Sequence, residues 1–495
     1  MAAAVANGTC DPFTARELPC EPGPSVTYAV NATDASDFTK AITFARDNNL
    51  RLVIRNTGHD YLGKSTGKWA LSVWTHYIKD TEYMPSYTSE AYVGPAMKIG
   101  AGIQVEEAYT AAHALGHLVV GGDCATVGVA GGYLQGGGHS ALSSMYGMAV
   151  DHVLEWEVVD GTGKLVRASP TENSDLYWAL SGGGAGTYGI VVSVVVKLQP
   201  DIPIAGVQLQ FDLDPDSPDA FYSAVSKYHE LVPAITSGPY YGMGIAEITN
   251  TSFLLTPLTL PDVSEDDARQ LLAPLVNQLT DDGLEFNLTV TESPSWLEYW
   301  QTLIKPNPTQ LVQNAQYGGW MVPRTIIDEQ SEDLQSAIQD ITDAGCVFVS
   351  LALDVSIPDI QNNVSISTTT QKNGTVVPQT RNSVLPAWRE AALYVILSTS
   401  WPAGANLEKM QLNAETMTQT CVRALSDLAP DAGAYMNEAD PNQPNWQKAF
   451  YGANYDRLLA IKNTYDPDHL FYATTAVGSD YYNIDAEGRL CQADM

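Results

Sequence analysis

Basic residues are scarce in this 495-residue chain. It has 25 lysines and arginines against 57 aspartates and glutamates, a formal net charge of −32, and only 17% of its residues are charged. Binding to nucleic acid or to an anionic membrane surface requires clustered lysine and arginine. The composition therefore argues against both partners. An acidic surface poor in basic groups is typical of a secreted, acid-tolerant protein, and a plain effect on solubility is the alternative explanation.

Long hydrophobic runs are also missing. The longest candidate, residues 190–196, is interrupted by Ser193 and falls well short of the ~18 residues of a membrane-spanning helix. The opening residues lack the length and the basic start of a signal peptide, as expected for a mature end whose leader has been removed. Six N-x-S/T sequons, however, predict N-glycans and a secreted, extracellular protein: Asn7, Asn31, Asn250, Asn287, Asn363 and Asn373.

Cysteines are few, and no two of them form a C-x-x-C pair, which argues against structural zinc and thioredoxin-like chemistry. The spacing of the histidines indicates no metal site either, and His113, His117 and His139 are expected to form structural hydrogen bonds. Cys10 and Cys20 bracket a short segment that contains proline, so a small disulfide loop is plausible there in an oxidising compartment. Cys124 differs because it lies among glycines. If it is committed to another bond, at most two disulfides form, and their pairing stays open among Cys10, Cys20, Cys346, Cys421 and Cys491.

Strand-like and helix-like segments alternate up to about residue 200. The pattern predicts strands over residues 26–30, 51–55, 153–159 and 190–198, and a helix over 35–49. The sequence pattern changes near residue 200 and again near residue 440. Between these points, strands such as 347–353 and 392–397 are expected beside amphipathic helices such as 264–279. A helix is expected over 446–462. The fold class is α+β or α/β up to residue 200, with a mixed region after it.

Two short motifs point to other enzyme classes. Residues 184–189 match the G-x-G-x-x-G dinucleotide fingerprint, but a helix-like segment precedes them and a strand follows, which is the reverse of the order that a Rossmann fold requires. Residues 63–67 match the G-x-S-x-G of serine hydrolases. A polar turn precedes Ser65, so a turn serine is favoured, and a hydrolase that uses His469 as a distant base is the rival enzyme class.

Three glycine-rich turns, at residues 55–61, 121–128 and 131–139, carry the third signal. Each glycine alone is compatible with an ordinary turn. Together they expose many backbone N–H groups without side-chain bulk, which suits a pyrophosphate and a flat ring. His59 and Cys124 lie inside these turns. A neutral imidazole and a thiolate are both nucleophiles that bond covalently to an electrophilic cofactor.

These turns, followed by residues 450–455, 465–467 and 469–471, resemble the FAD-linked oxidases of the vanillyl-alcohol oxidase/p-cresol methylhydroxylase superfamily. The resemblance is to the berberine-bridge-enzyme-like branch, and within it to fungal isoamyl-alcohol oxidases and oligosaccharide oxidases. It covers residues 10–200 and the C-terminal stretch. It implies an α+β flavoprotein of two domains. The FAD-binding domain, residues 1–200, is completed by residues 441–495, and a substrate domain, residues 201–440, holds an antiparallel sheet covered by helices.

The resemblance also implies how FAD is held. His59 bonds the flavin 8α-methyl group and Cys124 bonds ring atom C6, while Val127 stands where a small residue leaves dioxygen access. The other implied contacts lie in the turns, toward the adenosine and in the C-terminal segment: Arg55, Asn56, Thr57, Gly58, Asp60, Tyr61, Gly128, Gly132, Gly137, Gly138, Gly147, Asp151, Val153, Gly186, Gly189, Ile190, Asn454 and Tyr455.

For catalysis, the resemblance places Tyr61 at the position of an active-site tyrosine. Many relatives carry Tyr-x-Asn-Tyr, whose last tyrosine is the base, whereas this chain has Tyr435 to Glu438, so Glu438 replaces that tyrosine. A carboxylate does the same work if burial raises its pKa. A solvated acidic turn with Asp440 is the alternative. Stacking on a substrate ring is a further possibility for three aromatic residues, Tyr133, Trp320 and Tyr435.

The function implied is a secreted oxidase that transfers hydride from a small-molecule alcohol or carbohydrate to covalent FAD, with dioxygen reduced to hydrogen peroxide. Oxidative cyclisation in secondary metabolism is the alternative within the family. A serine hydrolase at Ser65 and a carbohydrate-binding flavoprotein without turnover are alternatives of other classes. The substrate and the oligomeric state stay open.

Overall fold

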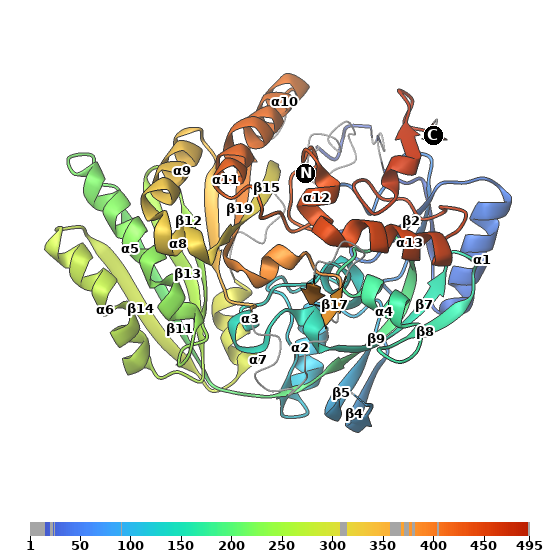
Figure 1. Ribbon diagram of the computed structural model, residues 1–495, viewed down its shortest axis with the longest axis horizontal. Helices are drawn as coiled ribbons and strands as arrows, with labels where there is room; N and C mark the ends of the chain where they lie inside the picture. Colours follow the sequence, from blue (N-terminus) through green and yellow to red (C-terminus); the bar gives the residue numbers. More distant parts are fainter. Residues whose placement is uncertain are drawn as a thin grey trace.

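A computed structural model of the chain describes residues 15–19, 23, 25–90, 92–306, 314–356, 368–370, 376–378, 382–402 and 405–493. They form two neighbouring regions, each built on β-sheet (Figure 1). The blue N-terminal and red C-terminal segments share the region at the right, and the middle of the chain forms the region at the left. The predicted α+β class with two sheet-containing regions is confirmed.

The N-terminal sheet is parallel and has the order β1-β3-β2 (Tyr28–Asn31, Leu71–Trp74, Leu52–Arg55). Helix α1 (Ala35–Asp47) begins where predicted, because the Asp34 carboxylate accepts hydrogen bonds from the N–H groups of Ser36 and Asp37 at 2.7 and 3.2 Å. It packs Phe38 and Ile42 into the core. β2 runs straight into the first glycine-rich turn, so the sheet fixes where that turn starts.

A five-stranded antiparallel sheet follows, in the order β4-β5-β9-β7-β8 (Thr81–Thr88, Val93–Gly100, Gly189–Lys197, Val153–Asp160, Leu165–Ala168). The predicted strands near 153–159 and 190–198 are its β7 and β9. Helix α4 (Ser174–Leu180) precedes residues 184–189 and β9 follows them. The interpretation against a Rossmann fold is therefore confirmed. The remaining elements of this region are α2 (Val105–His113), η2 (Val129–Tyr133), α3 (Ser143–Tyr146), η3 (Ala149–His152) and the pair β6 (His117–Leu118) and β10 (Gln199–Pro200).

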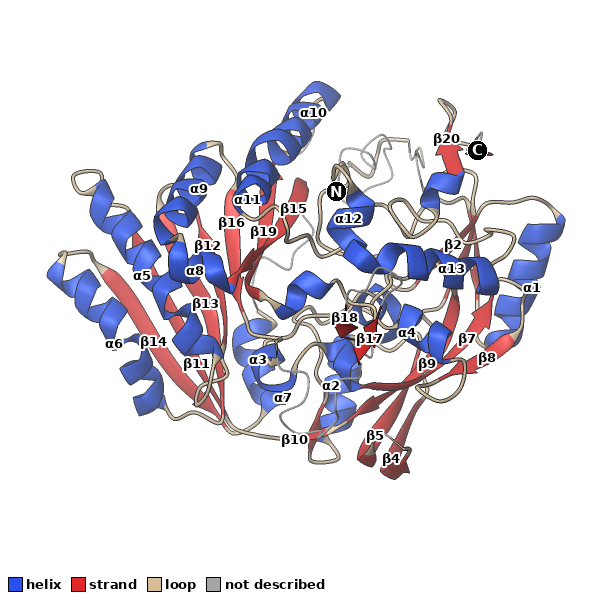
Figure 2. Ribbon diagram, in the orientation of Figure 1, coloured by secondary structure: helices blue, strands red, loops and turns tan. Residues whose placement is uncertain are grey.

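The second region is a seven-stranded antiparallel sheet with the order β14-β11-β13-β12-β16-β19-β15 (Phe286–Ser293, Ile204–Asp212, Ser252–Pro261, Met243–Ile248, Val347–Ala352, Ala391–Ser400, Ala315–Pro323). Helices lie along it in Figure 2: α5 (Pro218–Thr236), α6 (Glu265–Asp281), α8 (Arg324–Glu329), α9 (Ser331–Asp343), α10 (Leu407–Thr416) and α11 (Val422–Leu428). Side chains alternate between the two faces of a strand. Phe253 and Phe348 contact helix α5 on one face of the sheet. Leu351 lies three residues after Phe348 in the same strand and therefore points to the other face. Tyr394 is paired with Leu351, so it lies on that other face as well.

A disulfide joins Cys346, just before β16, to Cys421 in η7 (Met417–Cys421). Cys124 and Cys491 are free, and the predicted loop between Cys10 and Cys20 lies outside the described residues. The pairing that the sequence left open is thus assigned for two cysteines.

The C-terminal segment returns to the first region. The single helix expected over 446–462 is wrong: α12 (Trp446–Tyr451) ends at Gly452, whose φ of +54° and ψ of −134° break the helix, and α13 (Tyr455–Tyr465) begins after it. The buried Lys462 ammonium donates to the Thr187 and Phe471 carbonyls at 3.0 and 2.9 Å and pairs with Asp466 at 2.8 Å. This contact fixes α13 against the loop before β9.

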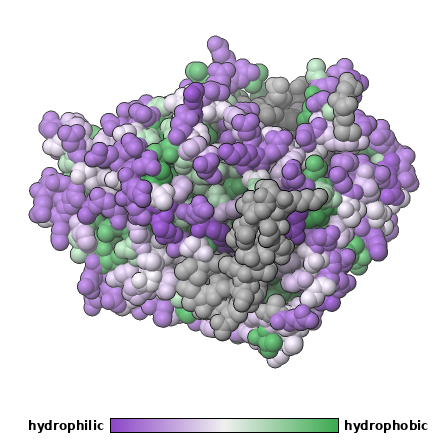
Figure 3. All heavy atoms as spheres, in the orientation of Figure 1, coloured by the Kyte–Doolittle hydropathy of each residue, from purple (hydrophilic) through white to green (hydrophobic). Residues whose placement is uncertain are grey.

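The remaining short elements are α7 (Trp296–Tyr299), η4 (Trp300–Ile304), β17 (Thr368–Thr370), β18 (Val376–Pro378), η6 (Pro386–Arg389), η8 (Gly452–Asn454), η9 (Ser479–Tyr481), β20 (Tyr482–Ile484) and β21 (Leu490–Gln492). Within the described ranges, no helix has the length and hydrophobicity needed to cross a bilayer. The face drawn in Figure 3 is largely hydrophilic, with hydrophobic groups scattered over it.

Candidate functional site

The turn after β2 is shaped by two of its own residues. Gly58 has a φ of +85°, and a Cβ atom there would lie 2.5 Å from the Arg55 guanidinium, so glycine is required. The Asp60 carboxylate accepts hydrogen bonds from the N–H groups of Leu62, Lys64 and Ser65 at 2.9, 2.8 and 3.0 Å. The turn is therefore held rigid from within.

Ser65 belongs to this turn rather than to a catalytic triad. Its hydroxyl donates to Asp60 at 2.7 Å. His469 instead stacks on Tyr481, with ring centroids 4.1 Å apart. Among the described residues no hydrogen bond joins Ser65 to a histidine, so the geometry gives the hydrolase interpretation no support.

His59 and Cys124 meet at one hydroxyl. Thr126 Oγ1 lies 2.7 Å from His59 Nε2 and 3.9 Å from Cys124 Sγ. Partial burial lowers the pKa of His59, which keeps its imidazole neutral and nucleophilic at neutral pH. The two predicted anchors, far apart in sequence, are therefore neighbours with the chemistry that two attachments to one ring require.

The polar groups around these anchors fit a flavin. The buried Asn56 Oδ1 has no hydrogen-bond partner within the described part of the chain, and a Cβ atom at Gly128 would collide with it. The backbone N–H groups of residues 57–59 and 122–124 likewise meet no protein acceptor among the described residues. Unpaired donors and an unpaired amide oxygen beside two nucleophiles match a phosphate-bearing cofactor with a polar ring edge.

The other predicted FAD contacts fall into two groups. Gly132 and Gly138 both lie in the third glycine-rich turn, where the Gly132 carbonyl accepts from Asn437 and the Gly138 N–H donates to the Tyr435 hydroxyl. Several more distant positions have side chains already engaged with protein. The buried Asp151 carboxylate forms a bidentate ion pair with Arg389 at 2.7 and 2.9 Å, which lowers the pKa of Asp151 although burial opposes it.

Asn454 donates to the Ser383 and Val384 carbonyls at 3.1 and 3.2 Å. The Tyr455 hydroxyl lies 3.3 Å from both Asp480 Oδ1 and the Gly478 N–H. Both side chains are thus already hydrogen-bonded to protein groups, and the structure shows no free polar side chain at these two positions for FAD. The remaining positions supply backbone: Gly137, Gly147 and Gly186 lie in loops, Val127 in the second turn, and Val153, Gly189 and Ile190 in β7 and β9.

Glu438 and His139 form the central charged pair. His139 Nε2 lies 3.1 and 3.0 Å from the two oxygens of the Glu438 carboxylate. Burial acts to lower the pKa of His139, but the charge and hydrogen bond of Glu438 outweigh it and raise that pKa. Glu438 is therefore not the freely solvated residue of the alternative interpretation. It is a carboxylate held in place by an imidazolium.

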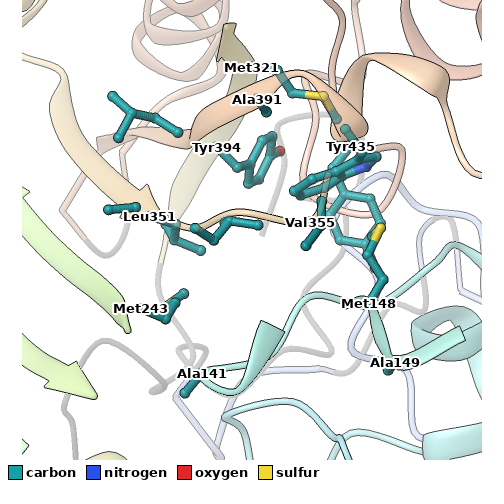
Figure 4. Close-up of a cluster of buried hydrophobic side chains, with 14 of the residues drawn as sticks. Ala141, Met148, Ala149, Met243, Met321, Leu351, Val355, Ala391, Tyr394 and Tyr435 are labelled. Atoms are coloured by element: carbon teal, nitrogen blue, oxygen red, sulfur yellow. The ribbon is translucent and has the colours of Figure 1, made fainter. Parts of the chain in front are cut away.

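Tyr435 lies beside this pair and is almost fully buried. Its hydroxyl accepts hydrogen bonds from the Gly138 N–H at 3.2 Å and from Asn437 Nδ2 at 2.8 Å. Burial and the charge of Glu438 raise the pKa of Tyr435, so its phenol stays protonated. Its ring packs edge-on against Tyr394 from β19, as Figure 4 shows. These contacts give Tyr435 a positioning role between the glycine turn and the seven-stranded sheet.

Tyr61 meets the second region directly. Its ring stacks on Tyr317 of β15, with centroids 4.5 Å apart and planes 15° from parallel. Partial burial and the charge of Glu438 raise the pKa of Tyr61, so the phenol is neutral and electrostatically coupled to the carboxylate. Tyr61 and Tyr317 thus form one aromatic wall close to Glu438.

Lys64 links the first glycine-rich turn to the segment around Tyr435 and Glu438. Its ammonium donates to the Met436 carbonyl at 3.1 Å, and burial lowers the pKa of Lys64 to about 8, against the opposing charge of Asp60. The loop that carries Tyr61 is thereby linked to the segment that carries Glu438.

Two residues of the candidate site, His139 and Tyr317, were not predicted from the sequence. His139 was expected to form only structural hydrogen bonds, and its position directly after the glycines 136–138 was the available signal. Tyr317 had no signal, because a lone tyrosine in a strand is usually core. Conversely, Trp320 is a core residue whose indole donates to the Ala429 carbonyl at 3.0 Å, and the Tyr133 hydroxyl donates to the His139 carbonyl at 2.8 Å. Within the described residues, no cluster of potential ligands suits a metal ion.

Known proteins match this chain in sequence and in fold. A family model described as an FAD binding domain matches residues 26–169, and one described as berberine and berberine like matches residues 434–478. The chain is 54% identical over 492 residues to the FAD-linked oxidoreductase patO of Aspergillus clavatus, covering 99% of this chain and 82% of the relative. It is 38% identical over 491 residues to the bifunctional decalin synthase calF of Penicillium decumbens, covering 98% and 82%. The crystal structure of the VAO-type flavoprotein MtVAO615 from Myceliophthora thermophila C1 superposes with a TM-score of 0.88 at 37% identity, covering 98% of this chain and 85% of that one.

Proposed function

Because this chain belongs to the berberine-bridge-enzyme-like, VAO-type FAD-linked oxidoreductases, we propose that it is an oxidase for a hydroxyl-bearing small molecule. The substrate class is an alcohol or a carbohydrate, and dioxygen is the electron acceptor, giving hydrogen peroxide. The observation that carries the proposal is the Glu438 carboxylate, held by His139 beside the turn that bears His59 and Tyr61.

FAD would be held covalently by His59 and Cys124, with the N–H groups of the first two glycine-rich turns around it. When bound, the flavin accepts a hydride from substrate carbon and passes the two electrons to dioxygen. The convergence of both anchors on Thr126 supports the double attachment. Val127, in the same turn, supports access for dioxygen.

Glu438 would act as the base that removes the hydroxyl proton. Both of its oxygens lie within 3.1 Å of His139 Nε2, which stabilises the carboxylate, and each oxygen keeps a further lone pair with which to accept the substrate proton. Tyr61 and Tyr435 are protonated phenols near that carboxylate, suited to donating hydrogen bonds to a substrate oxygen or to keeping the base in place. The stacked rings of Tyr61 and Tyr317 would bind the flat face of the substrate.

Oxidative ring formation is the second candidate, since the relative calF is a decalin synthase. The same base and the same hydride acceptor would serve this reaction, in which the oxidised substrate forms a ring before the product is released. Secretion and N-glycosylation are part of the proposal and are supported by the exposure of the sequon residues Asn31, Asn250 and Asn287.

A denaturation test separates the flavoprotein from its rivals. Acid-precipitated protein is expected to stay yellow, because covalent flavin survives unfolding. A colourless pellet with no flavin in the supernatant would overturn the proposal. Alcohols and oligosaccharides are then screened for peroxide release. A yellow protein that releases peroxide but whose product is a ring-closed compound, and not the simple carbonyl product, would favour the second candidate.

A further inference from the structure

Asp123, the residue before the predicted anchor Cys124, is half-buried and carries a carboxylate to which neither the family resemblance nor the proposed reaction assigns a role. Its backbone is fixed, because Trp300 Nε1 donates to the Asp123 carbonyl at 2.9 Å and the Tyr109 hydroxyl donates to the Gly122 carbonyl at 2.9 Å. Its side-chain atom Oδ1 is buried and has no hydrogen-bond partner among the described residues. A fixed carboxylate without a partner is costly in an interior, so it calls for a compensating charge.

His139 has the complementary feature. Its Nε2 faces Glu438, while its Nδ1 is also buried and also lacks a hydrogen-bond partner within the described chain. Burial raises the pKa of Asp123 to about 6, the positive charge of His139 acts to lower it, and Asp123 in turn helps to raise the pKa of His139. Tyr133 lies between the two segments: a Cβ atom at Gly122 would lie 3.1 Å from its ring, and its hydroxyl donates to the His139 carbonyl at 2.8 Å. The imidazole therefore has one carboxylate in hydrogen-bond contact and a second one in its neighbourhood.

Of the charged groups that act on Asp123, His139 is the positive one. Glu438 is negative and raises the pKa of Asp123 further. The phenols whose own pKa values are raised in part by Asp123 come from α2, η2 and α7, and all are buried or half-buried and neutral: Tyr109, Tyr133 and Tyr299.

The geometry points to Asp123 as a positioning residue that holds His139 in its imidazolium form, with Nε2 donating to Glu438. This inference rests on the proposed role of Glu438 as base. Without the charge at position 123, the imidazolium loses part of its stabilisation, and Glu438 then loses part of its counter-charge. The pKa of His139 should therefore fall.

The test uses Asp123→Asn in the flavinylated enzyme, with Glu106→Gln as control. Glu106 is a carboxylate on the outer side of α2, paired with Lys305 at 2.5 Å, so its loss removes a nearby charge without touching His139. Two quantities are measured: the pH profile of kcat/KM, and the titration of His139 by NMR of labelled histidines, assigned with His139→Gln. In Asp123→Asn, the His139 titration is expected to move down by about half a pH unit, a roughly threefold change, and the pH profile of kcat/KM is expected to differ from that of the parent. Glu106→Gln should leave both where they are.

Unchanged values of both quantities in Asp123→Asn would overturn the inference. If Asp123→Asn does not fold, Asp123→Glu, which keeps the charge, is compared with Asp123→Ser by histidine titration. A wild-type titration in both variants would equally overturn it. Failure of the base assignment is distinguishable, because Glu438→Gln would then stay active while the titration still reports on Asp123 and His139.

Discussion

His139 and Glu438, 299 residues apart in sequence, meet in a contact that joins one imidazole nitrogen to both oxygens of one carboxylate, at 3.1 and 3.0 Å. Their side chains are only 12% and 20% exposed, so water weakens the pair little. The contact joins the third glycine-rich turn to the segment that follows the second region. It places an oriented carboxylate at the boundary between the two sheet-containing regions.

Glu438→Gln should abolish proton removal while leaving the flavin attached. The amide keeps the shape of the side chain but is not a base, and general-base catalysis contributes about 10²–10⁴-fold to rate. We expect kcat, measured as peroxide release, to fall by that factor with an unchanged flavin spectrum. Glu230→Gln, at an exposed ion pair with Lys227, is the control and should keep full activity. Full activity in Glu438→Gln would reject the role of base.

The same pair should make stability depend on pH. The pKa of His139 is raised in the folded protein, so its contribution is complete below its unfolded value of about 6.5 and is lost as pH rises through the folded value. Glu438→Gln removes this contribution. We therefore expect its melting temperature to lie further below that of the unsubstituted protein at pH 6 than at pH 9. Equal differences at the two pH values would show that the imidazolium does not stabilise the fold.

Single substitutions at the anchors should each leave one covalent bond. His59→Ala and Cys124→Ala are expected to stay yellow after acid precipitation, with absorbance spectra that differ from the parent and from each other. The double variant should release its flavin into the supernatant. Thr126→Val tests the hydroxyl between them and should slow attachment without preventing it. If neither single variant changed the spectrum, the double attachment would be wrong.

Features of the site that depend on neighbouring residues were predictable from the sequence, whereas contacts between segments far apart in the chain were not. His59, Cys124 and the glycines around them lie within short turns, where residue type and local spacing determine backbone conformation, so these turns and the reversed 184–189 motif were predictable. The pairing of His139 with Glu438 depends on how two distant segments pack, and no local pattern contains it. The same holds for Tyr317 against Tyr61, and for Asp151, whose carboxylate is used by Arg389. The break at Gly452 was missed because helical periodicity continues on both sides of it.

Tyr317→Ala should weaken substrate binding more than chemistry. It removes the ring that stacks on Tyr61 but touches neither the base nor the anchors. Aromatic pairs contribute about 0.5–1.5 kcal/mol beyond buried area, so KM should rise by roughly two- to tenfold, with kcat changed less. Tyr317→Phe keeps the stacked ring and is the matched control. A fall in kcat alone would place Tyr317 in the chemical step instead.

Lys462→Met should destabilise the whole protein, because it breaks a buried ion pair that closes the first region. Lys462 and Asp466 are 1% and 0% exposed, and the ammonium also satisfies the Thr187 and Phe471 carbonyls. Methionine fills the space but leaves Asp466 charged and two carbonyls unpaired, a loss of about 3–5 kcal/mol in the free energy of unfolding. Lys448→Met removes a well exposed lysine whose nearest carboxylate, on Asp431, lies 3.9 Å away, and should change little. Denaturant unfolding of the flavinylated enzyme measures both. Equal midpoints for the two variants would mean that the C-terminal segment is held by apolar packing of α13 rather than by this pair.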